Sequence, residues 1–218
     1  MKTFICIALG LMVAALADAA CAAELLATVR DTKGRPVSDA VVLAVPLDRK
    51  AFDLAKPVRH VVDQVNKEFV PYVRVIFSGT SVSFPNNDNI RHHVYSFSPA
   101  KKFELSLYSG VTAPPVLFDK TGVVVLGCNI HDWMLGYIYV ADTPFFAKTE
   151  REGQAVVENL PPGHYQVRLW HPDMEKDEQA TLQRVTVTDK TQNISMIVAL
   201  KPSFRIPRPT GAGNSSYR

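Results

Sequence analysis

Three side chains that could bind a soft metal ion follow one another in the middle of the chain. They are Cys128, His131 and Met134, with two residues between each and the next, and they offer a thiolate, an imidazole and a thioether. These are three of the four donors of a mononuclear copper site, in which two His and one Cys form a trigonal plane and a weakly bound Met is axial. A second imidazole is available in the dipeptide His92-His93. The spacing therefore predicts a copper site.

The candidate ligands lie between segments with the composition of β-strands. Val, Ile, Tyr, Phe and Thr gather in short runs that are separated by Gly, Pro, Asn or Asp, which is typical of many short strands. Val123–Cys128 ends at the first candidate ligand, Gly136–Ala141 follows the last one, and His92–Ser98 carries the second imidazole. We expect an all-β protein built of sandwiches or barrels, with one short helix over Pro57–Gln64.

Strand geometry explains why this spacing suits a metal. A Cys at the end of a strand is held by the sheet, and a short turn can bring His131 back towards the same ion. Met134 can then approach from one side of the plane before the next strand begins. Because neighbouring residues of a strand face opposite sides, only one of His92 and His93 can point at the metal.

The segment 65–142 resembles a cupredoxin of the plastocyanin and amicyanin branch. The resemblance is carried by Phe84-Pro85-Asn86-Asn87-Asp88, by His92-His93-Val94 and by the run from Cys128 through Met134 to Val140. It implies a Greek-key β-sandwich and a single copper ion that alternates between Cu(I) and Cu(II). It also implies that the metal ligands are His92, Cys128, His131 and Met134.

The same resemblance implies a protein that carries electrons and is not an enzyme. Its partner would be a redox protein, a cytochrome or a dehydrogenase, bound transiently. Two residues depart from the family pattern. His93 replaces an Asn that usually steadies the ligand loop, and Gly127 stands where several relatives have an aromatic residue before the Cys.

The two ends of the chain resemble a different family. Gly34-Arg35-Pro36-Val37 within a hairpin, and Leu160-Pro161-Pro162-Gly163-His164-Tyr165 before a strand, are similar to the carboxypeptidase-regulatory or transthyretin-like sandwich. This implies a second, Ig-like β-sandwich made of residues 24–62 and 144–201, with the cupredoxin inserted between the two parts. Consecutive separate domains are the alternative. Trp170 is expected in the core of this sandwich.

The N-terminal segment predicts that the protein is exported. Lys2, the apolar run Phe4–Leu16 and the small residues that follow describe a signal peptide over residues 1–22. The apolar run is shorter than the roughly 20 residues that span a bilayer, and we expect a periplasmic protein without a membrane span. Cleavage would leave Cys128 as the only thiol, without a disulfide partner.

The C-terminal segment and the overall charge are less informative. Residues 202–218 are rich in Pro, Gly, Ser and Arg, which predicts a disordered basic tail. A net charge of +3 gives no indication of nucleic-acid binding.

Other interpretations of these residues stay open at this point. Cys128 could be a small buried hydrophobe, Met134 could fill the core, and Cys128 with His131 could form a nucleophilic pair. The protein could also store or deliver copper, or be an adhesion or carbohydrate-binding module with a structural metal site. The histidines outside the central segment are expected at the surface or in caps: His60, His164 and His171.

Overall fold

The computed structural model describes residues 23–48, 59–109 and 114–203. The expected signal peptide and most of the expected tail, from residue 204 onwards, lie outside these ranges. Within them the chain is all-β, as predicted, and its one helical segment is a single 3-10 turn, η1 (Glu178–Thr181). The helix expected over Pro57–Gln64 is wrong for the described residues. The β-branched sequence there forms β3 (His60–Val61) and begins β4 (Asp63–Val65).

Seven strands from the two ends of the chain form what we call the flanking sandwich. One of its sheets has the order β14-β1-β17 and the other has the order β13-β2-β15-β16. The strands are β1 (Ala23–Asp31), β2 (Val41–Pro46), β13 (Phe146–Lys148), β14 (Gln154–Leu160), β15 (Gly163–Trp170), β16 (Gln183–Val187) and β17 (Gln192–Val198).

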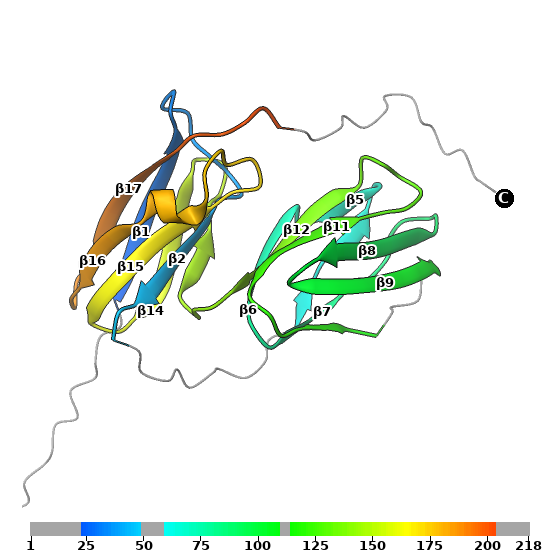
Figure 1. The fold of residues 1–218 in the computed structure, drawn as a ribbon, viewed down its shortest axis with the longest axis horizontal. Helices are drawn as coiled ribbons and strands as arrows, with labels where there is room; N and C mark the ends of the chain where they lie inside the picture. The colour runs from blue at the N-terminus through cyan, green and yellow to red at the C-terminus, as the bar shows by residue number, and fades with distance from the viewer. Residues whose placement is uncertain (1–22, 49–58, 110–113, 204–218) are drawn as a thin grey trace, which may run out of the picture.

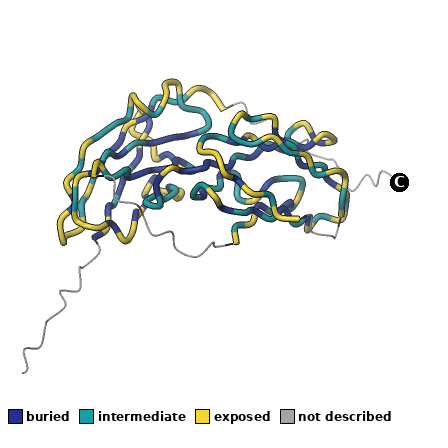
Figure 2. Tube along the Cα trace, turned by 60° about the horizontal axis from the view of Figure 1, so that its bottom comes forward, coloured by how far each residue is buried: buried dark blue, intermediate teal, exposed yellow. Residues whose placement is uncertain are grey.

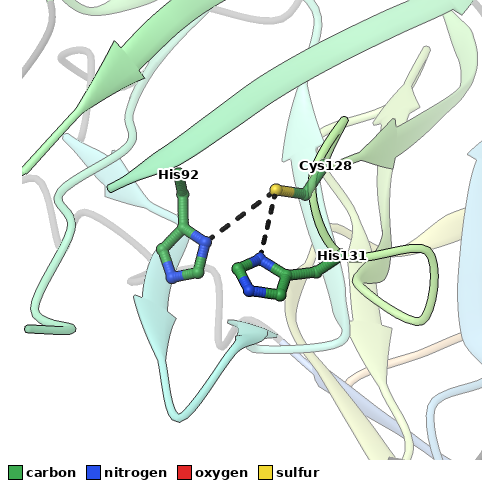
Figure 3. Close-up of side chains that lie close together, drawn as sticks. All are labelled: His92, Cys128 and His131. Carbon is green, nitrogen blue, oxygen red and sulfur yellow. Dashed lines mark hydrogen bonds between the residues drawn. The ribbon is translucent and has the colours of Figure 1, made fainter. Parts of the chain in front are cut away.

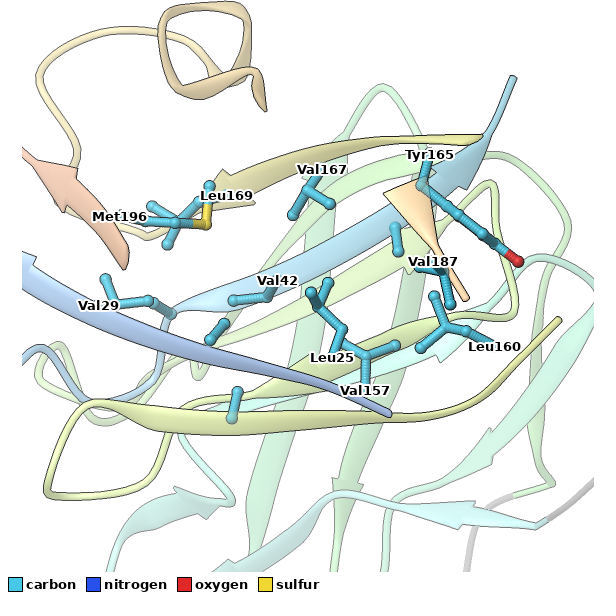
Figure 4. Close-up of a cluster of buried hydrophobic side chains, with 14 of the residues drawn as sticks. Leu25, Val29, Val42, Val157, Leu160, Tyr165, Val167, Leu169, Val187 and Met196 are labelled. Atoms are coloured by element: carbon cyan, nitrogen blue, oxygen red, sulfur yellow. The ribbon is translucent and has the colours of Figure 1, made fainter. Parts of the chain in front are cut away.

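Alternating burial explains how these two sheets face each other. Along β1 and β14, every second residue is buried for most of the length, as expected of strands with one face on a core. The buried side chains of the two sheets meet in one cluster, which Figure 4 shows. Leu25 and Val157 from the first sheet pack against Val42, Val167 and Leu169 from the second.

The strands between them in sequence form the central sandwich. Its main sheet has the order β6-β12-β11-β8-β9, a smaller one has the order β10-β7-β3, and β4 pairs with β5 in a hairpin. The further strands are β5 (Glu68–Val70), β6 (Val73–Phe77), β7 (Thr80–Ser83), β8 (His92–Ser98), β9 (Lys101–Tyr108), β10 (Val116–Phe118), β11 (Gly122–Gly127) and β12 (Leu135–Ala141).

A second buried cluster fills the central sandwich. Phe84 and Phe118 lie at its centre with their rings 6.4 Å apart, and Leu126 and Ile138 contribute from the main sheet. Cys128 and Met134 belong to the same cluster. The tube in Figure 2 shows buried segments running through both sandwiches and exposed residues gathered in the turns.

The chain enters the flanking sandwich, leaves it after β2, builds the central sandwich from β3 to β12, and returns at β13 (Figure 1). The strand β3 pairs with β7, so it belongs to the central sandwich. The expected first segment, 24–62, therefore extends too far, because His60 and Val61 hydrogen-bond into the central sheets. No helix in the described ranges has the length and apolar character needed to cross a membrane.

A third cluster joins the two sandwiches. Trp170 of β15 packs on Tyr137 and Tyr139 of β12, with ring centroids 5.8 and 5.3 Å apart, and Val41 and Val73 are buried beside them. The sequence analysis expected Trp170 in the core of the flanking sandwich. It lies instead at the boundary between the flanking and the central sandwich. The strand β12 therefore begins directly after the loop 128–134, and its outer face packs on the flanking sandwich.

Removing the Trp170 ring tests this junction. We expect Trp170→Ala to lower the free energy of unfolding by about 3 to 5 kcal/mol, because a large buried ring is lost between two sheets. Chemical denaturation followed by the fluorescence of Trp133, the other tryptophan of the sequence, measures the effect. Ile197→Ala, on an exposed side chain of the flanking sandwich, is the control and should change the value by less than about 0.5 kcal/mol. Equal effects would contradict a packed junction.

Candidate metal centre

Cys128 lies directly after a strand that is held on both sides. The preceding residue, Gly127, pairs with Leu135 of β12 and with Tyr95 of β8. Cys128 itself is 4% exposed and forms part of the buried cluster of the central sandwich. The sheet therefore fixes the position of its sulfur.

The loop that follows brings His131 back to this sulfur. The backbone N–H of Met134 donates a hydrogen bond of 2.9 Å to the carbonyl oxygen of His131, which closes a tight turn. His131 Nδ1 lies 3.7 Å from Cys128 Sγ (Figure 3). A further turn lies at Asn129 and Ile130, between Cys128 and His131, as the spacing predicted.

His92 approaches from the neighbouring strand. It is the first residue of β8, its side chain is fully buried, and its Nδ1 lies 3.8 Å from Cys128 Sγ (Figure 3). The ligand atoms of His92, Cys128 and His131 all lie within 4.8 Å of one another. Three soft or borderline donors from two segments far apart in sequence therefore converge on one point.

These separations fit a bound metal ion. A metal–nitrogen bond of about 2.0 Å and a metal–sulfur bond of about 2.3 Å, at a trigonal angle, separate the two donor atoms by about 3.7 Å. The sulfur of Cys128 lies at nearly this distance from the Nδ1 atoms of both His92 and His131. The donors need no rearrangement of the backbone to share one ion.

The other nitrogen of His92 is bound to a carboxylate. His92 Nε2 lies 2.7 Å from Asp88 Oδ2. An ionised carboxylate only accepts hydrogen bonds, so the ring proton is on Nε2, and Nδ1 keeps its lone pair towards the sulfur. A hydrogen bond of this kind fixes the tautomer and the orientation of a metal-binding imidazole.

Asp88 is in turn held by the turn of the β4–β5 hairpin. Its two carboxylate oxygens accept the backbone N–H groups of Asn66 and Lys67, at 2.6 and 2.8 Å. Both turn residues have positive φ, 55° and 60°, as the type I′ turn of a two-residue hairpin loop requires. The backbone N–H of Asp88 donates to Asn86 Oδ1 at 3.0 Å. The hairpin therefore determines where the His92 ring lies.

The surroundings of His131 favour its neutral form. Burial lowers the pKa of His131, and the nearby His92 and Lys67 lower it further. Asp88 and Asp132 act in the opposite direction without reversing the shift. A neutral imidazole has a free lone pair, which is the form that binds metals.

Met134 is buried near these donors. It is 2% exposed and lines the same surface cavity as Cys128. The Trp133 side chain packs over the loop, with its ring 5.1 Å from that of His131. His131 is consequently only 9% exposed.

The remaining histidines take no part in the cluster. His93 is on the opposite face of β8, where its Nε2 lies 3.0 Å from Glu104 Oε1, off the direction of a hydrogen bond. His164 Nδ1 lies 3.1 Å from Thr186 Oγ1, and His171 Nδ1 accepts the backbone N–H of Asp173. His164 is exposed, as expected, whereas His171 is buried and His60 is half-buried in β3, where a surface position was expected.

Sequence reasoning did not find the role of Asp88. A signal for it exists in the sequence, because Asp88 precedes His92 by four residues in the motif that carried the resemblance. It also did not find Tyr95, whose ring lies against Gly127, the residue noted above as a departure from the family pattern.

Comparisons with known proteins give only distant similarities. No family model matches the chain, and no curated protein matches it. Among solved structures, a Cu-containing nitrite reductase from Thermus scotoductus SA-01 is similar over 45% of this chain and 25% of its own, with 26% identity and a TM-score of 0.38. A purple cupredoxin from Nitrosopumilus maritimus is similar over 38% of this chain and 99% of its own, with 21% identity and a TM-score of 0.32. An amicyanin variant in its reduced Cu(I) form covers 45% and 98%, with 19% identity and a TM-score of 0.35.

The hydrogen bond between Asp88 and His92 can be tested by metal affinity. We expect Asp88→Ala to weaken copper binding by about 10- to 100-fold, because the His92 ring loses the partner that orients it. Asp88→Asn should restore part of the affinity, since its amide oxygen can still accept the proton of Nε2. Competition titration with a chelator of known affinity is the measurement.

Asp132→Ala is the matched control, because this exposed carboxylate lies next to His131 and makes no hydrogen bond within the described ranges. It should change the affinity by less than about twofold. An Asp88 variant that binds as tightly as this control would contradict the role of Asp88.

Proposed function

We propose that this chain is a periplasmic mononuclear type 1 copper protein that carries single electrons between redox partners and is not an enzyme. The observation that carries the proposal is the convergence of Cys128 Sγ with the Nδ1 atoms of His92 and His131 in a buried position. One thiolate and two imidazoles form the plane of such a site, and Met134 supplies the axial thioether. Copper bound there would supply a one-electron couple between Cu(I) and Cu(II).

The residues around the donors suit electron transfer. Cys128 is fixed by its strand, His92 by Asp88 and His131 by a closed turn, so the donors change little when the charge of the centre changes. The low exposure of all three excludes water from the plane. A soft thioether beside a thiolate favours copper over zinc as the occupant.

The arrangement gives less support to a nucleophilic pair. In a catalytic pair of Cys and His, a third group orients the base. Within the described ranges, no carboxylate or amide hydrogen-bonds to the His131 ring. The carboxylate of the centre, Asp88, binds His92 instead.

We propose three parts for the exported chain. The sheet pairings support a central cupredoxin inserted into a second, Ig-like sandwich, because strands on both sides of it in sequence share the flanking sheets. Allowing for β3, the central part begins before His60 and ends near Asp142. A signal peptide over residues 1–22 and a basic tail over 202–218 complete the proposal. A cytochrome or a dehydrogenase is the proposed redox partner.

The visible spectrum tests the type of site. We expect addition of one equivalent of Cu(II) to give a strong absorption at about 600 nm and narrow copper hyperfine splitting in the electron paramagnetic resonance spectrum. Cys128→Ser should abolish the absorption, because it arises from the bond between copper and the thiolate. Colourless binding with rapid release to a chelator would favour copper storage or delivery instead. Absence of copper binding would leave an adhesion or carbohydrate-binding module.

The adjacent histidines provide a matched pair of variants. His92→Ala removes a ring that faces the sulfur, so we expect the blue absorption to be lost. His93→Ala removes the next ring, which faces away, and should leave the absorption in place with only a small change in its energy. The reverse result, loss of colour in the His93 variant alone, would rule out His92 as the ligand.

A further inference from the structure

The outer face of the main central sheet is covered at one side only. On β12, Tyr137 and Tyr139 of this face pack against Trp170 of the flanking sandwich. The sheet register places Val125 of β11 beside Tyr137, and Tyr95 of β8 beside Gly127. The same face therefore continues from the junction of the two sandwiches onto β11 and β8, where no strand of the described ranges covers it.

The uncovered part carries a row of aromatic and apolar side chains. Phe97 is 77% exposed, the highest fraction among the large apolar residues of the described ranges. Its ring lies 5.2 Å from that of Tyr95, which lies 5.9 Å from that of His93, and Val125 is exposed beside them. We call these four residues the aromatic strip. Clustered apolar groups on a surface mark interaction sites more often than single ones do.

The aromatic strip adjoins the metal centre. A Cβ atom on Gly127 would lie 2.8 Å from the Tyr95 ring, so this ring rests directly on the backbone before Cys128. A surface cavity of about 420 Å³ is lined by Tyr95 and Phe97 of the strip together with Cys128 and Met134. The strip thus lies beside the end of β11 that precedes Cys128, whereas the Trp133 ring packs against His131.

Positive charge borders the strip next to Phe97. A neighbouring hollow is lined by Phe97 and by the three lysines Lys101, Lys102 and Lys120. Asp119 is the one acidic residue of its lining. Asp119 pairs with Lys101 at 3.7 Å. Lys102 and Lys120 are exposed and form no ion pair within the described ranges. On the other sides, Glu104 lies beside His93, and Asp132 lines the cavity.

We propose that the aromatic strip, with Lys102 and Lys120 at its edge, is the docking surface for an acidic one-electron redox protein. The lysines steer an acidic partner, and Phe97 with Tyr95 provides the apolar anchor that such interfaces place at their centre. Cu(II) held by His92, Cys128 and His131 would be reduced to Cu(I) as the partner is oxidised by one electron, and no bond would form or break. This electron-transfer step rests on the function proposed above, while the docking itself does not.

Nuclear magnetic resonance tests the docking surface with a defined probe. We expect cytochrome b5, an acidic haem protein, to shift the amide signals of Tyr95, Phe97, Lys102 and Val125 when it is added to the ¹⁵N-labelled protein. The double variant Lys102→Glu and Lys120→Glu should weaken this binding by about tenfold. Shifts confined to other surfaces, or an affinity that the double variant leaves unchanged, would overturn the proposal.

Matched controls lie on the flanking part of the chain. Lys176→Glu together with Lys190→Glu makes the same change of charge on exposed side chains outside the central sandwich, and should leave the pattern of shifted signals unchanged. Phe97→Ala should weaken the binding about tenfold without changing any charge. An effect of the control pair equal to that of Lys102 and Lys120 would show that net charge alone attracts the probe, and would overturn the docking surface.

Stopped-flow reduction of the copper-loaded protein separates this proposal from the proposed function. With reduced cytochrome b5, Phe97→Ala should lower the bimolecular rate constant about tenfold while the visible spectrum stays the same. If the blue absorption is absent, the proposed function fails, and the signal shifts of the metal-free protein still decide the docking surface. If the absorption is normal and neither variant affects rate or shifts, the docking surface alone is wrong.

Discussion

The candidate metal centre depends on the fixed position of one buried imidazole, that of His92, whose two nitrogens face Asp88 and Cys128. His92 is fully buried, so the proton on its Nε2 needs a partner, and Asp88 provides one at 2.7 Å. In the neutral ring, this hydrogen bond places the proton on Nε2 and leaves the lone pair of Nδ1 on the side of Cys128 Sγ. Without it the ring would have no fixed tautomer, and the two other donors would lack the third member of their plane.

The constraint extends into parts of the fold that hold no ligand. The β4–β5 hairpin binds the Asp88 carboxylate through two backbone N–H groups, so these hydrogen bonds do not depend on the side chains of Asn66 and Lys67. Further from the centre, Gln64 and Asn86 donate to backbone carbonyls of the segment that leads to His92. On the other side, β12 carries the ligand loop at its start and the junction with Trp170 on its outer face. The flanking sandwich therefore supports the sheet that positions the candidate metal ligands.

The sequence was most informative where local spacing and strand alternation decide the structure. The predicted strand His92–Ser98 has the same bounds as β8, and alternation along it correctly placed His92 and His93 on opposite faces. The turn between Cys128 and His131 also followed from spacing alone. In each of these cases the interacting groups are neighbours in the chain or belong to one strand.

What escaped prediction depends on contacts between distant segments. The hairpin turn at Asn66 reaches Asp88 only after both loops have folded. Tyr95 fills the space above Gly127 because β8 and β11 are neighbours in the sheet, which composition does not reveal. A helix was expected over Pro57–Gln64, but pairing with β7 makes His60 and Val61 a strand. Trp170 was expected in a core, and the contact between the two sandwiches determines its place.

X-ray absorption at the copper edge is the most direct test of the central claim. For the protein loaded with one equivalent of copper, we expect one sulfur neighbour at about 2.3 Å and two imidazole nitrogens at about 2.0 Å. A first shell of only nitrogen and oxygen atoms would mean that Cys128 does not bind the metal, and would contradict the account.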